Sequence, residues 1–344
     1  AQIYRYAKRP LVYKLMEKVV LDYIFPYPRR LSLLADTIGL YQVSGLQRSV
    51  HLSRLLKLIP GELDQVELML PTVPSRKLRR ELPEVTPAEG ERRLRVAFFS
   101  GCVMNLLYPS VNAKAVRLMA LQGCEVIVPR DQICCGALHS HRGNLETARR
   151  MARKNLDVFS QLDVEAVVAD APGCSSVLKE YPELLRDEPT YQEKALKFRD
   201  KIRDISELLV GEPLNGRLGQ VPLKVVYDQP CHLLHAQRIS QEPHTLIRSI
   251  PGVELLPLVE SEMCCGSAGI YTLTHTEMSL QILDRKMENI LRSGAQAIVT
   301  GNPGCLLQLR LGALRRKAPL EVLHYVELLD RSYQAGKAIA TVRG

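Results

Sequence analysis

The sequence contains the same cysteine pattern twice. The first copy consists of Cys102, Cys134, Cys135 and Cys174, and the second of Cys231, Cys264, Cys265 and Cys305. Corresponding cysteines are separated by 129 to 131 residues. In both copies the adjacent pair is followed by glycine, and the last cysteine is preceded by Pro-Gly. A repeat with matching flanks indicates a duplicated domain.

Each copy has the pattern of an α/β fold. Short apolar runs suited to buried strands occupy residues 94–100, 125–128, 166–169, 223–227 and 297–300, and helical periodicity covers 111–122, 144–159 and 277–292. The cysteines fall at or just after the strand ends, where parallel sheets hold their ligands. We therefore expect two duplicated Rossmann-like modules with parallel sheets, packed face to face. Their predicted limits are 94–215 and 216–335, followed by a tail at 336–344.

The first 93 residues differ in character from the repeat. They are expected to form a helical, basic arm and, over 70–90, a Pro- and Glu-rich linker. Residues 1–95 carry a balance of +7 out of the chain's net charge of +9. Tyrosines among Lys and Arg in residues 4–30 suit an interfacial helix or a subunit interface equally well. A membrane surface or an acidic partner could use this charge, and we expect no nucleic-acid partner.

The cysteine count indicates the compartment. There are nine cysteines, an odd number, and no secretory signal. This argues against a secreted disulfide framework and favours metal or redox chemistry in the reducing cytoplasm. The sequence also lacks an apolar run of roughly 18 residues or more, so no membrane-spanning helix is expected.

Four thiolates per module suit a metal cluster. Thiolates favour iron–sulfur clusters and zinc, and a [4Fe–4S] cluster takes about four of them. Adjacent cysteines reach two irons more comfortably than one small ion, and Gly136 and Gly266 relieve the backbone beside them. All eight repeated cysteines are thus candidate ligands of two [4Fe–4S] clusters. Structural zinc in one or both modules, a metal-free dithiol or disulfide centre, and inert buried cysteines are the alternatives.

The remaining candidates lie near these motifs. Cys124 has no counterpart in the second copy and is expected to be a small apolar core residue rather than a fifth ligand. Five histidines follow the motifs: His139, His141, His232, His235 and His275. They could donate protons or tune a cluster, or simply be capping or surface residues. His232 is our candidate proton donor because it follows Cys231 directly.

These motifs resemble the cysteine-rich CCG domain found in heterodisulfide reductase, in anaerobic glycerol-3-phosphate dehydrogenase and in lactate-utilisation proteins. Over residues 94–335 they look most like the glycolate oxidase iron–sulfur subunit family. The matching segments are Gly101–Met104, Cys134–His139, Cys264–Tyr271 and Gly301–Gln308. The resemblance implies an electron-transfer subunit that takes electrons from a flavin subunit oxidising glycolate or another 2-hydroxyacid. It also implies delivery of these electrons to quinone, with the protein held at the inner face of the membrane.

Two departures from the family pattern affect this expectation. The fuller pattern ends each module in Cys-x-x-Cys, but Ala171 and Asn302 occupy the first of these positions. This favours a four-thiolate cluster over a five-thiolate one and weakens the case for disulfide reduction. The family's ferredoxin-like part, with its Cys-x-x-Cys runs, is absent from these 344 residues. It is expected either to have been cut off or to reside on another chain.

Three functions therefore remain open. The favoured one is the electron-transfer subunit of an oxidoreductase complex, in which the isolated chain does not oxidise the substrate because it has no visible flavin or nucleotide motif. The second is a zinc-stabilised scaffold that organises partner subunits. The third is a thiol–disulfide reductase of the heterodisulfide reductase type.

Overall fold

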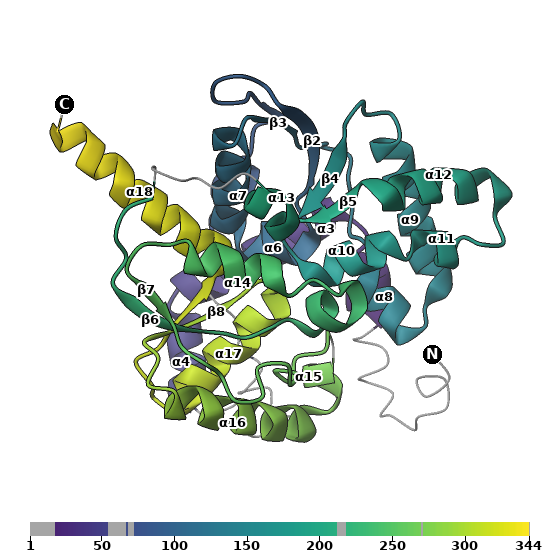
Figure 1. The fold of residues 1–344 in the computed structure, drawn as a ribbon. Coiled ribbons are helices and arrows are strands. Elements are labelled where there is room, and N and C mark those ends of the chain that lie inside the picture. The colour runs from purple at the N-terminus through teal and green to yellow at the C-terminus, as the bar shows by residue number, and fades with distance from the viewer. Residues whose placement is uncertain (1–17, 54–66, 68–71, 212–217, 270, 344) are drawn as a thin grey trace.

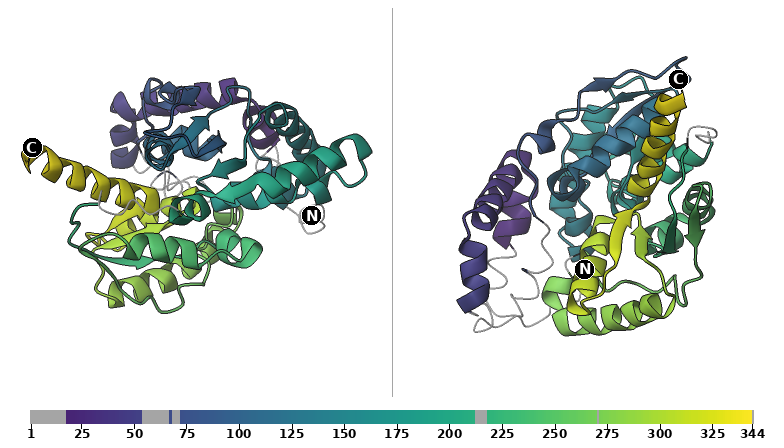
Figure 2. Two further views of the ribbon diagram at one scale, coloured as in Figure 1. Left: turned by 45° about the horizontal axis from the view of Figure 1, so that its top comes forward. Right: turned by 90° about the vertical axis from the view of Figure 1, so that its left-hand side faces the viewer.

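The protein has two α/β modules and an N-terminal helical arm. A computed structural model describes residues 18–53, 67, 72–211, 218–269 and 271–343. In Figure 1 the first module lies above the second. Figure 2 shows the helices of the arm along one side.

Each module is built on a parallel sheet. The first sheet has the order β1-β3-β2-β4-β5 and contains β1 (Val85–Thr86), β2 (Leu94–Phe99), β3 (Cys124–Ile127), β4 (Ala166–Ala169) and β5 (Ile202–Asp204). The second has the order β7-β6-β8-β9 and contains β6 (Leu223–Tyr227), β7 (Val253–Leu255), β8 (Ala297–Thr300) and β9 (Glu321–His324). All neighbours are parallel except β1 and β3. The shared order β3-β2-β4-β5 and β7-β6-β8-β9 confirms the predicted duplicated α/β fold.

Helices surround both sheets. The arm contains the π-helix η1 (Val19–Ile24), α3 (Pro28–Val43), α4 (Leu46–Ser53) and the short 3₁₀ helix η3 (Leu78–Arg80). The first module contains α6 (Cys102–Leu107), α7 (Pro109–Leu121), α8 (Ala137–Arg142), α9 (Leu145–Phe159), α10 (Pro172–Lys179), α11 (Tyr181–Leu184), α12 (Pro189–Lys201) and α13 (Ile205–Gly211). The second contains the π-helix η4 (His232–Ala236), α14 (Gln241–Arg248), α15 (Tyr271–Thr274), α16 (Thr276–Arg292), α17 (Pro303–Arg315) and α18 (Tyr325–Arg343).

The elements expected from the apolar patterns are present, but the shortest strands were not predicted. β1, β5 and β7 have two or three residues, too few for a clear periodicity, and the four-residue β9 was not predicted either. β1 lies within 70–90, which we expected to be a linker; instead, Val85 pairs with Ile127 and extends the first sheet. Residues 336–343, expected to be a tail, continue α18.

The strand β2 shows how the core forms. Val96 and Phe98 point to one side of the sheet and Ala97 and Phe99 to the other, because successive side chains of a strand alternate. All four are essentially inaccessible to solvent. The cluster around Phe98 continues into the second module, where it includes Val225. The two modules therefore share one hydrophobic core.

The carboxyl ends of the two sheets meet at the module interface. The His324 Nε2 atom, at the end of β9, lies 2.9 Å from the carbonyl oxygen of Asp170 and 3.0 Å from that of Gly301. The Tyr325 hydroxyl donates to Asp204 Oδ1 over 3.0 Å. Because Asp170 directly follows β4 and Asp204 is the last residue of β5, these bonds join corresponding ends of the two sheets. In Figure 1, α18 runs from this interface along α7 of the first module.

The described part of the arm docks on the first module. His139 Nε2 lies 2.7 Å from the carbonyl oxygen of Leu21, and Asn144 Nδ2 donates to Asp22 over 2.8 Å. Tyr23 and Tyr27 are exposed, whereas the other tyrosines of residues 4–30 lie outside the described residues. Within the described part of the chain, no helix combines the length and apolar character required to cross a membrane.

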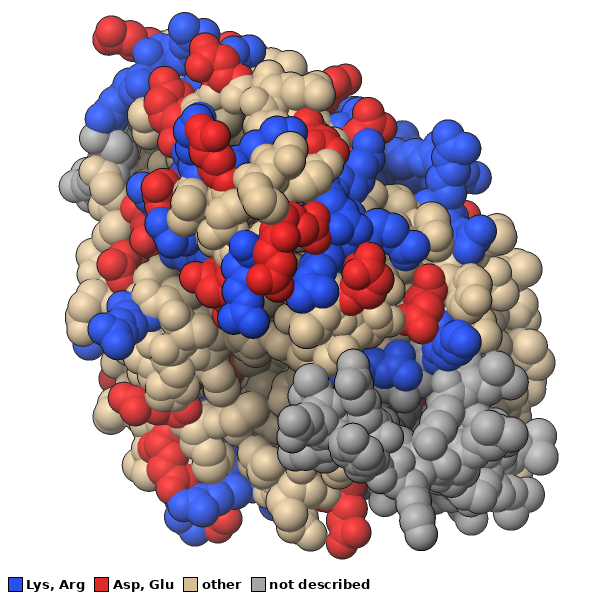
Figure 3. Space-filling view, turned by 90° about the vertical axis from the view of Figure 1, so that its right-hand side faces the viewer, with Lys and Arg blue, Asp and Glu red and all other residues tan. Residues whose placement is uncertain are grey.

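Charges of both signs alternate on the face drawn in Figure 3. Ion pairs account for part of this pattern on α9 and α12: Arg153 with Glu188, Lys194 with Asp157, and Lys197 with Glu193. The described residues of this face therefore present no uniformly basic surface of the kind that binds nucleic acid.

Candidate iron–sulfur centres

The four repeated cysteines of the first module converge at the carboxyl end of its sheet. Cys102 is the first residue of α6, directly after β2, and Cys174 lies in the first turn of α10, after β4. Cys134 and Cys135 occupy the loop between β3 and α8. The sulfurs of Cys102 and Cys134 are 3.3 Å apart, and those of Cys135 and Cys174 are 3.5 Å apart.

The second module repeats this arrangement. Cys231 directly precedes η4, the adjacent cysteines lie between β7 and α15, and Cys305 is in the first turn of α17. The proximity of Cys264 raises the pKa of the Cys231 thiol. The sulfurs of Cys265 and Cys305 are 3.4 Å apart. The structure thus gathers all eight predicted ligands into two groups of four.

One thiol in each group has a lowered pKa. Hydrogen bonds from Cys102 and Cys135 hold the pKa of Cys134 well below its usual range, while the same bonds and burial raise the pKa of Cys102 and Cys135. In the second module, the hydrogen bond from Cys231 likewise lowers the pKa of Cys264. The thiolate is the form that binds metals, so each site already favours a ligand anion.

The glycine after each cysteine pair adopts a conformation that other residues avoid. Gly136 has φ +88° and Gly266 has φ +93°. A Cβ atom at Gly266 would lie 2.5 Å from the carbonyl oxygen of Ser279. The N–H of Gly266 donates to the Cys264 sulfur over 3.4 Å. Glycine therefore permits the turn that directs a backbone N–H toward a ligand sulfur.

The two departures from Cys-x-x-Cys lie at the starts of α10 and α17. Asn302 donates from Nδ2 to the Cys305 sulfur over 3.6 Å and accepts from the Gly173 N–H over 3.4 Å. Asn302 thereby connects the cysteine loops of both modules. Ala171 is buried and has no polar side chain that could do the same.

Different residues support the two Cys-Cys loops. In the first module, buried Asn155 accepts from the Ile133 N–H over 3.0 Å and donates to the Cys134 carbonyl over 3.2 Å. At the corresponding position of α16 is Lys286, which donates to the carbonyls of Glu260 and Ser261 over 3.1 and 3.0 Å. The Lys286 ammonium also pairs with buried Asp228 at 3.0 Å.

These supporting residues were not identified from the sequence. Asp228 was detectable, since it is a charged residue directly after the apolar strand β6. Nothing in the helical patterns distinguishes Asn155 or Lys286 from solvent-facing residues. Their importance follows from burial, which is essentially complete for all three residues.

The histidines separate into different environments. The rings of His141 and His232, from different modules, stack with centroids 5.2 Å apart. Burial lowers the pKa of His141, and burial together with His141 lowers that of His232. His139 is buried and contacts the arm, whereas His235 and His275 are exposed. His324, which was not among the predicted site residues, joins the modules.

Cys124 is separate from both cysteine groups. It begins β3, at the opposite end of the strand from the Cys-Cys loop, and belongs to the hydrophobic core. Burial raises the pKa of its thiol to about 11. The prediction of a small apolar core residue is confirmed.

The donor set fits an iron–sulfur cluster better than a single ion. Each module offers four sulfur ligands, two of them adjacent in sequence, together with a backbone N–H directed at a sulfur. Among the described residues, no three or more His, Cys, Asp or Glu side chains are grouped so that they could hold one metal ion.

Comparison with known proteins identifies the family. A cysteine-rich domain model matches residues 96–179 and 225–310, and a model of the glycolate oxidase iron–sulfur subunit linker region matches residues 13–70. A probable glycolate oxidase iron–sulfur subunit of Bacillus subtilis is 39% identical over 95% of this chain and 74% of its own length. The chain belongs to the glycolate oxidase iron–sulfur subunit family.

More distant relatives share parts of the chain. The glycolate oxidase iron–sulfur subunit of Escherichia coli is 32% identical over 79% of this chain and 67% of its own length. A lactate utilization protein A of Exiguobacterium is 29% identical over 68% of this chain and 96% of its own length. A hypothetical Helicobacter pylori protein has a similar fold, with a TM-score of 0.53 at 13% identity. This match covers 80% of this chain and 54% of the other.

Proposed function

We propose that this protein is the iron–sulfur electron-transfer subunit of a flavin-dependent 2-hydroxyacid dehydrogenase, with glycolate as the favoured substrate of the complex. The observation that carries the proposal is the convergence of eight cysteines, distant in sequence, into two groups of four. Membership of the glycolate oxidase iron–sulfur subunit family supports it.

In this proposal each group of four cysteines holds one [4Fe–4S] cluster. When bound, such a cluster supplies one-electron redox chemistry. The chain contributes thiolate ligands, and the N–H groups beside them favour the reduced state because they stabilise added negative charge. Asn302 adds a further donor to the Cys305 sulfur.

Substrate oxidation belongs to a partner in this proposal. A flavin subunit removes electrons from the 2-hydroxyacid, and this subunit passes them toward quinone at the inner face of the membrane, to which it attaches peripherally from the cytoplasm. A ferredoxin-like part, on this protein or another chain, completes the relay. The isolated 344 residues are expected not to oxidise glycolate.

His232 is the proposed proton donor for reduction of the electron acceptor. Burial and the neighbouring His141 lower the pKa of His232, so its imidazolium form gives up a proton to the acceptor more readily than an ordinary histidine does. A His232→Gln variant should reduce acceptor turnover, measured with the assembled complex, and exposed His235→Gln is the matched control. Unchanged turnover in His232→Gln contradicts this role.

Metal analysis tests the main proposal. Anaerobically purified protein should contain about eight iron and eight acid-labile sulfide per chain, as two four-iron clusters require. Cys174→Ser and Cys305→Ser should each lower the iron content by about half, because each removes one ligand of one module. Low-temperature EPR before and after dithionite should show reduced clusters in the parent protein.

The same measurements separate the alternatives. Zinc with little iron contradicts the electron-transfer proposal and indicates a structural scaffold. Metal-free protein that reduces a low-molecular-weight disulfide indicates a thiol–disulfide reductase. Replacement of the additional cysteines by Ala171 and Asn302 disfavours that activity.

A further inference from the structure

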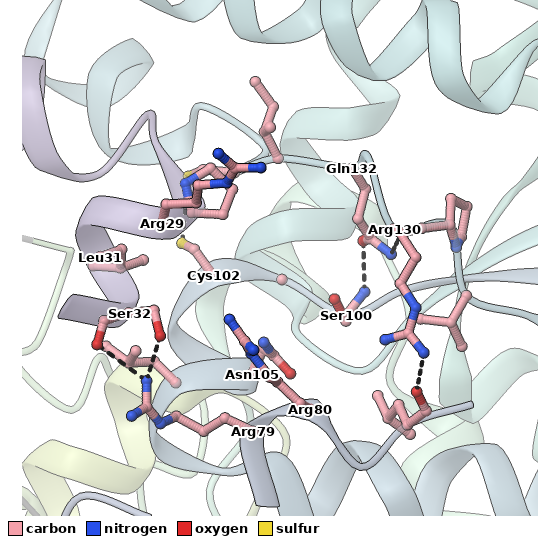
Figure 4. Close-up of a pocket in the computed structure, with 18 of the residues that line it drawn as sticks. Arg29, Leu31, Ser32, Arg79, Arg80, Ser100, Cys102, Asn105, Arg130 and Gln132 are labelled. Atoms are coloured by element: carbon pink, nitrogen blue, oxygen red, sulfur yellow. Dashed lines mark hydrogen bonds between the residues drawn. The ribbon is translucent and has the colours of Figure 1, made fainter. Parts of the chain in front are cut away.

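A cavity of about 300 Å³ opens onto the cysteines of the first module. It lies between the arm and the carboxyl ends of β2 and β3, where α/β folds bind ligands. The half-buried Cys102 and the buried Cys134 form part of its wall. Figure 4 shows Arg29 near Cys102, Arg80 beside Asn105, and Arg130 in another part of the lining.

The charged residues of this wall all carry the same sign. Its lining contains four arginines and no Asp or Glu among the described residues. Arg79 forms an ion pair with Asp36 and a hydrogen bond with Ser32, and Arg130 donates to the Leu82 carbonyl over 2.8 Å. These bonds hold two of the arginines in the wall, and the ion pair with Asp36 offsets the charge of Arg79.

Two of the arginines remain available. Neither the Arg29 nor the Arg80 guanidinium forms a hydrogen bond or an ion pair within the described part of the chain, and both side chains are exposed. Asn105, drawn beside Arg80 in Figure 4, is a further polar side chain of the lining. The cavity therefore offers planar guanidinium donors to a ligand without a competing carboxylate in its described lining.

Part of the remaining wall is apolar. Phe25, Leu31, Leu106 and Ile133 line the same space. Its volume is at the lower end of the range of roughly 300–1,000 Å³ typical of small-molecule pockets. An apolar wall favours an organic ligand over a fully hydrated inorganic anion, because only the organic ligand buries carbon there.

We propose that this cavity binds a small organic carboxylate, with its carboxylate toward Arg29 and Arg80 and its carbon chain against the apolar wall. A guanidinium matches a carboxylate with two parallel hydrogen bonds. A bound anion would lie close to Cys102 and Cys134, where its negative charge opposes the arrival of an electron. Occupancy is therefore expected to lower the reduction potential of the first module. This inference goes beyond the proposed electron-transfer function.

Isothermal titration calorimetry of the purified protein with butyrate tests the site. Butyramide, the neutral amide of the same shape, and inorganic phosphate are the comparison ligands. Butyrate should bind more tightly than either. Arg29→Gln and Arg80→Gln should each weaken butyrate binding by up to about fivefold, as expected for an exposed ion pair, and the double variant by more.

Arg76→Gln is the matched control, because Arg76 is an exposed arginine close in sequence to Arg80 but outside the cavity lining. It should leave butyrate affinity unchanged. Equal binding of butyrate and butyramide, tighter binding of phosphate, or equal losses in Arg76→Gln and the cavity variants overturns the proposal. Calorimetry detects binding whether or not iron is present, so failure of the electron-transfer proposal would remain distinguishable.

Discussion

The two modules share their strand order and cysteine placement but stabilise their cysteine loops differently. The first uses neutral groups: Asn155 contacts both sides of the loop, and the Tyr181 hydroxyl donates to the Cys135 carbonyl over 3.0 Å. The second uses the buried ion pair of Lys286 and Asp228. Asn155 and Lys286 are 131 residues apart, the same separation as Cys174 and Cys305. The two modules thus share the placement of their cysteines, but the residues that support the cysteine loops are charged in one module and neutral in the other.

This difference has an electrostatic consequence. Both members of the ion pair are inaccessible to solvent, so their charges are weakly screened. The Lys286 charge contributes to the lowered pKa of Cys264, and the charge of Cys264 in turn contributes to the raised pKa of Asp228. The corresponding position in the first module is occupied by the uncharged Asn155. The two modules should therefore differ in how strongly they stabilise negative charge on their cysteine sulfurs.

The largest expected effect comes from removing the lysine of the second module. Lys286→Met leaves Asp228 buried without its charged partner, which typically costs about 3–5 kcal/mol of unfolding free energy. Asn155→Leu in the first module leaves backbone groups unsatisfied but no charge, and should cost about 1–3 kcal/mol. Urea unfolding under anaerobic conditions, at matched iron content, measures both.

The double variant Lys286→Met/Asp228→Asn is the control for this comparison. It removes both charges and should recover part of the loss, because a buried unpaired carboxylate no longer remains. If Asn155→Leu destabilises the protein as much as Lys286→Met, or if the double variant recovers nothing, the contrast between a charged and a neutral support is wrong.

A smaller, pH-dependent effect is expected at the junction of the modules. Val326 N donates to His324 Nδ1 over 3.1 Å, so Nε2 carries the proton that the carbonyls of Asp170 and Gly301 accept. Burial lowers the pKa of His324 in the folded protein. Its contribution to stability is therefore present above the unfolded pKa of about 6.5 and is lost as the pH falls toward the folded pKa.

His324→Gln removes this titration. The stability difference between parent and variant should be largest near pH 7.5 and shrink below about pH 6.5, by at most about 1.4 kcal/mol per pH unit. Thermal unfolding of both proteins at several pH values gives the difference, and exposed His275→Gln serves as control. Asp204 has the opposite effect in both proteins: burial raises its pKa to about 6, so its contribution to stability grows as the pH falls. A difference that does not depend on pH would show that His324 does not titrate on unfolding.

The cysteine sites were predictable because their signals are local. The strand at 166–169 was predicted from four consecutive apolar residues, and the structure has Ala166–Ala169. Gly136 and Gly266 were predicted from the turn that adjacent cysteines require, and both have positive φ. Chain order then placed the cysteines after the strands, and parallel pairing brought those strand ends together.

The sequence by itself determined the duplication, the α/β class and the eight cysteines that converge. Only the tertiary structure decided the strand β1, the Lys286–Asp228 pair, the His324 junction and the arginine-lined cavity beside Cys102. Each of these joins segments far apart in the chain. Periodicity reports which face of a helix or strand is buried, but not which partner a buried polar group will meet. That choice is made when the desolvation of each polar group is balanced by contacts from distant segments.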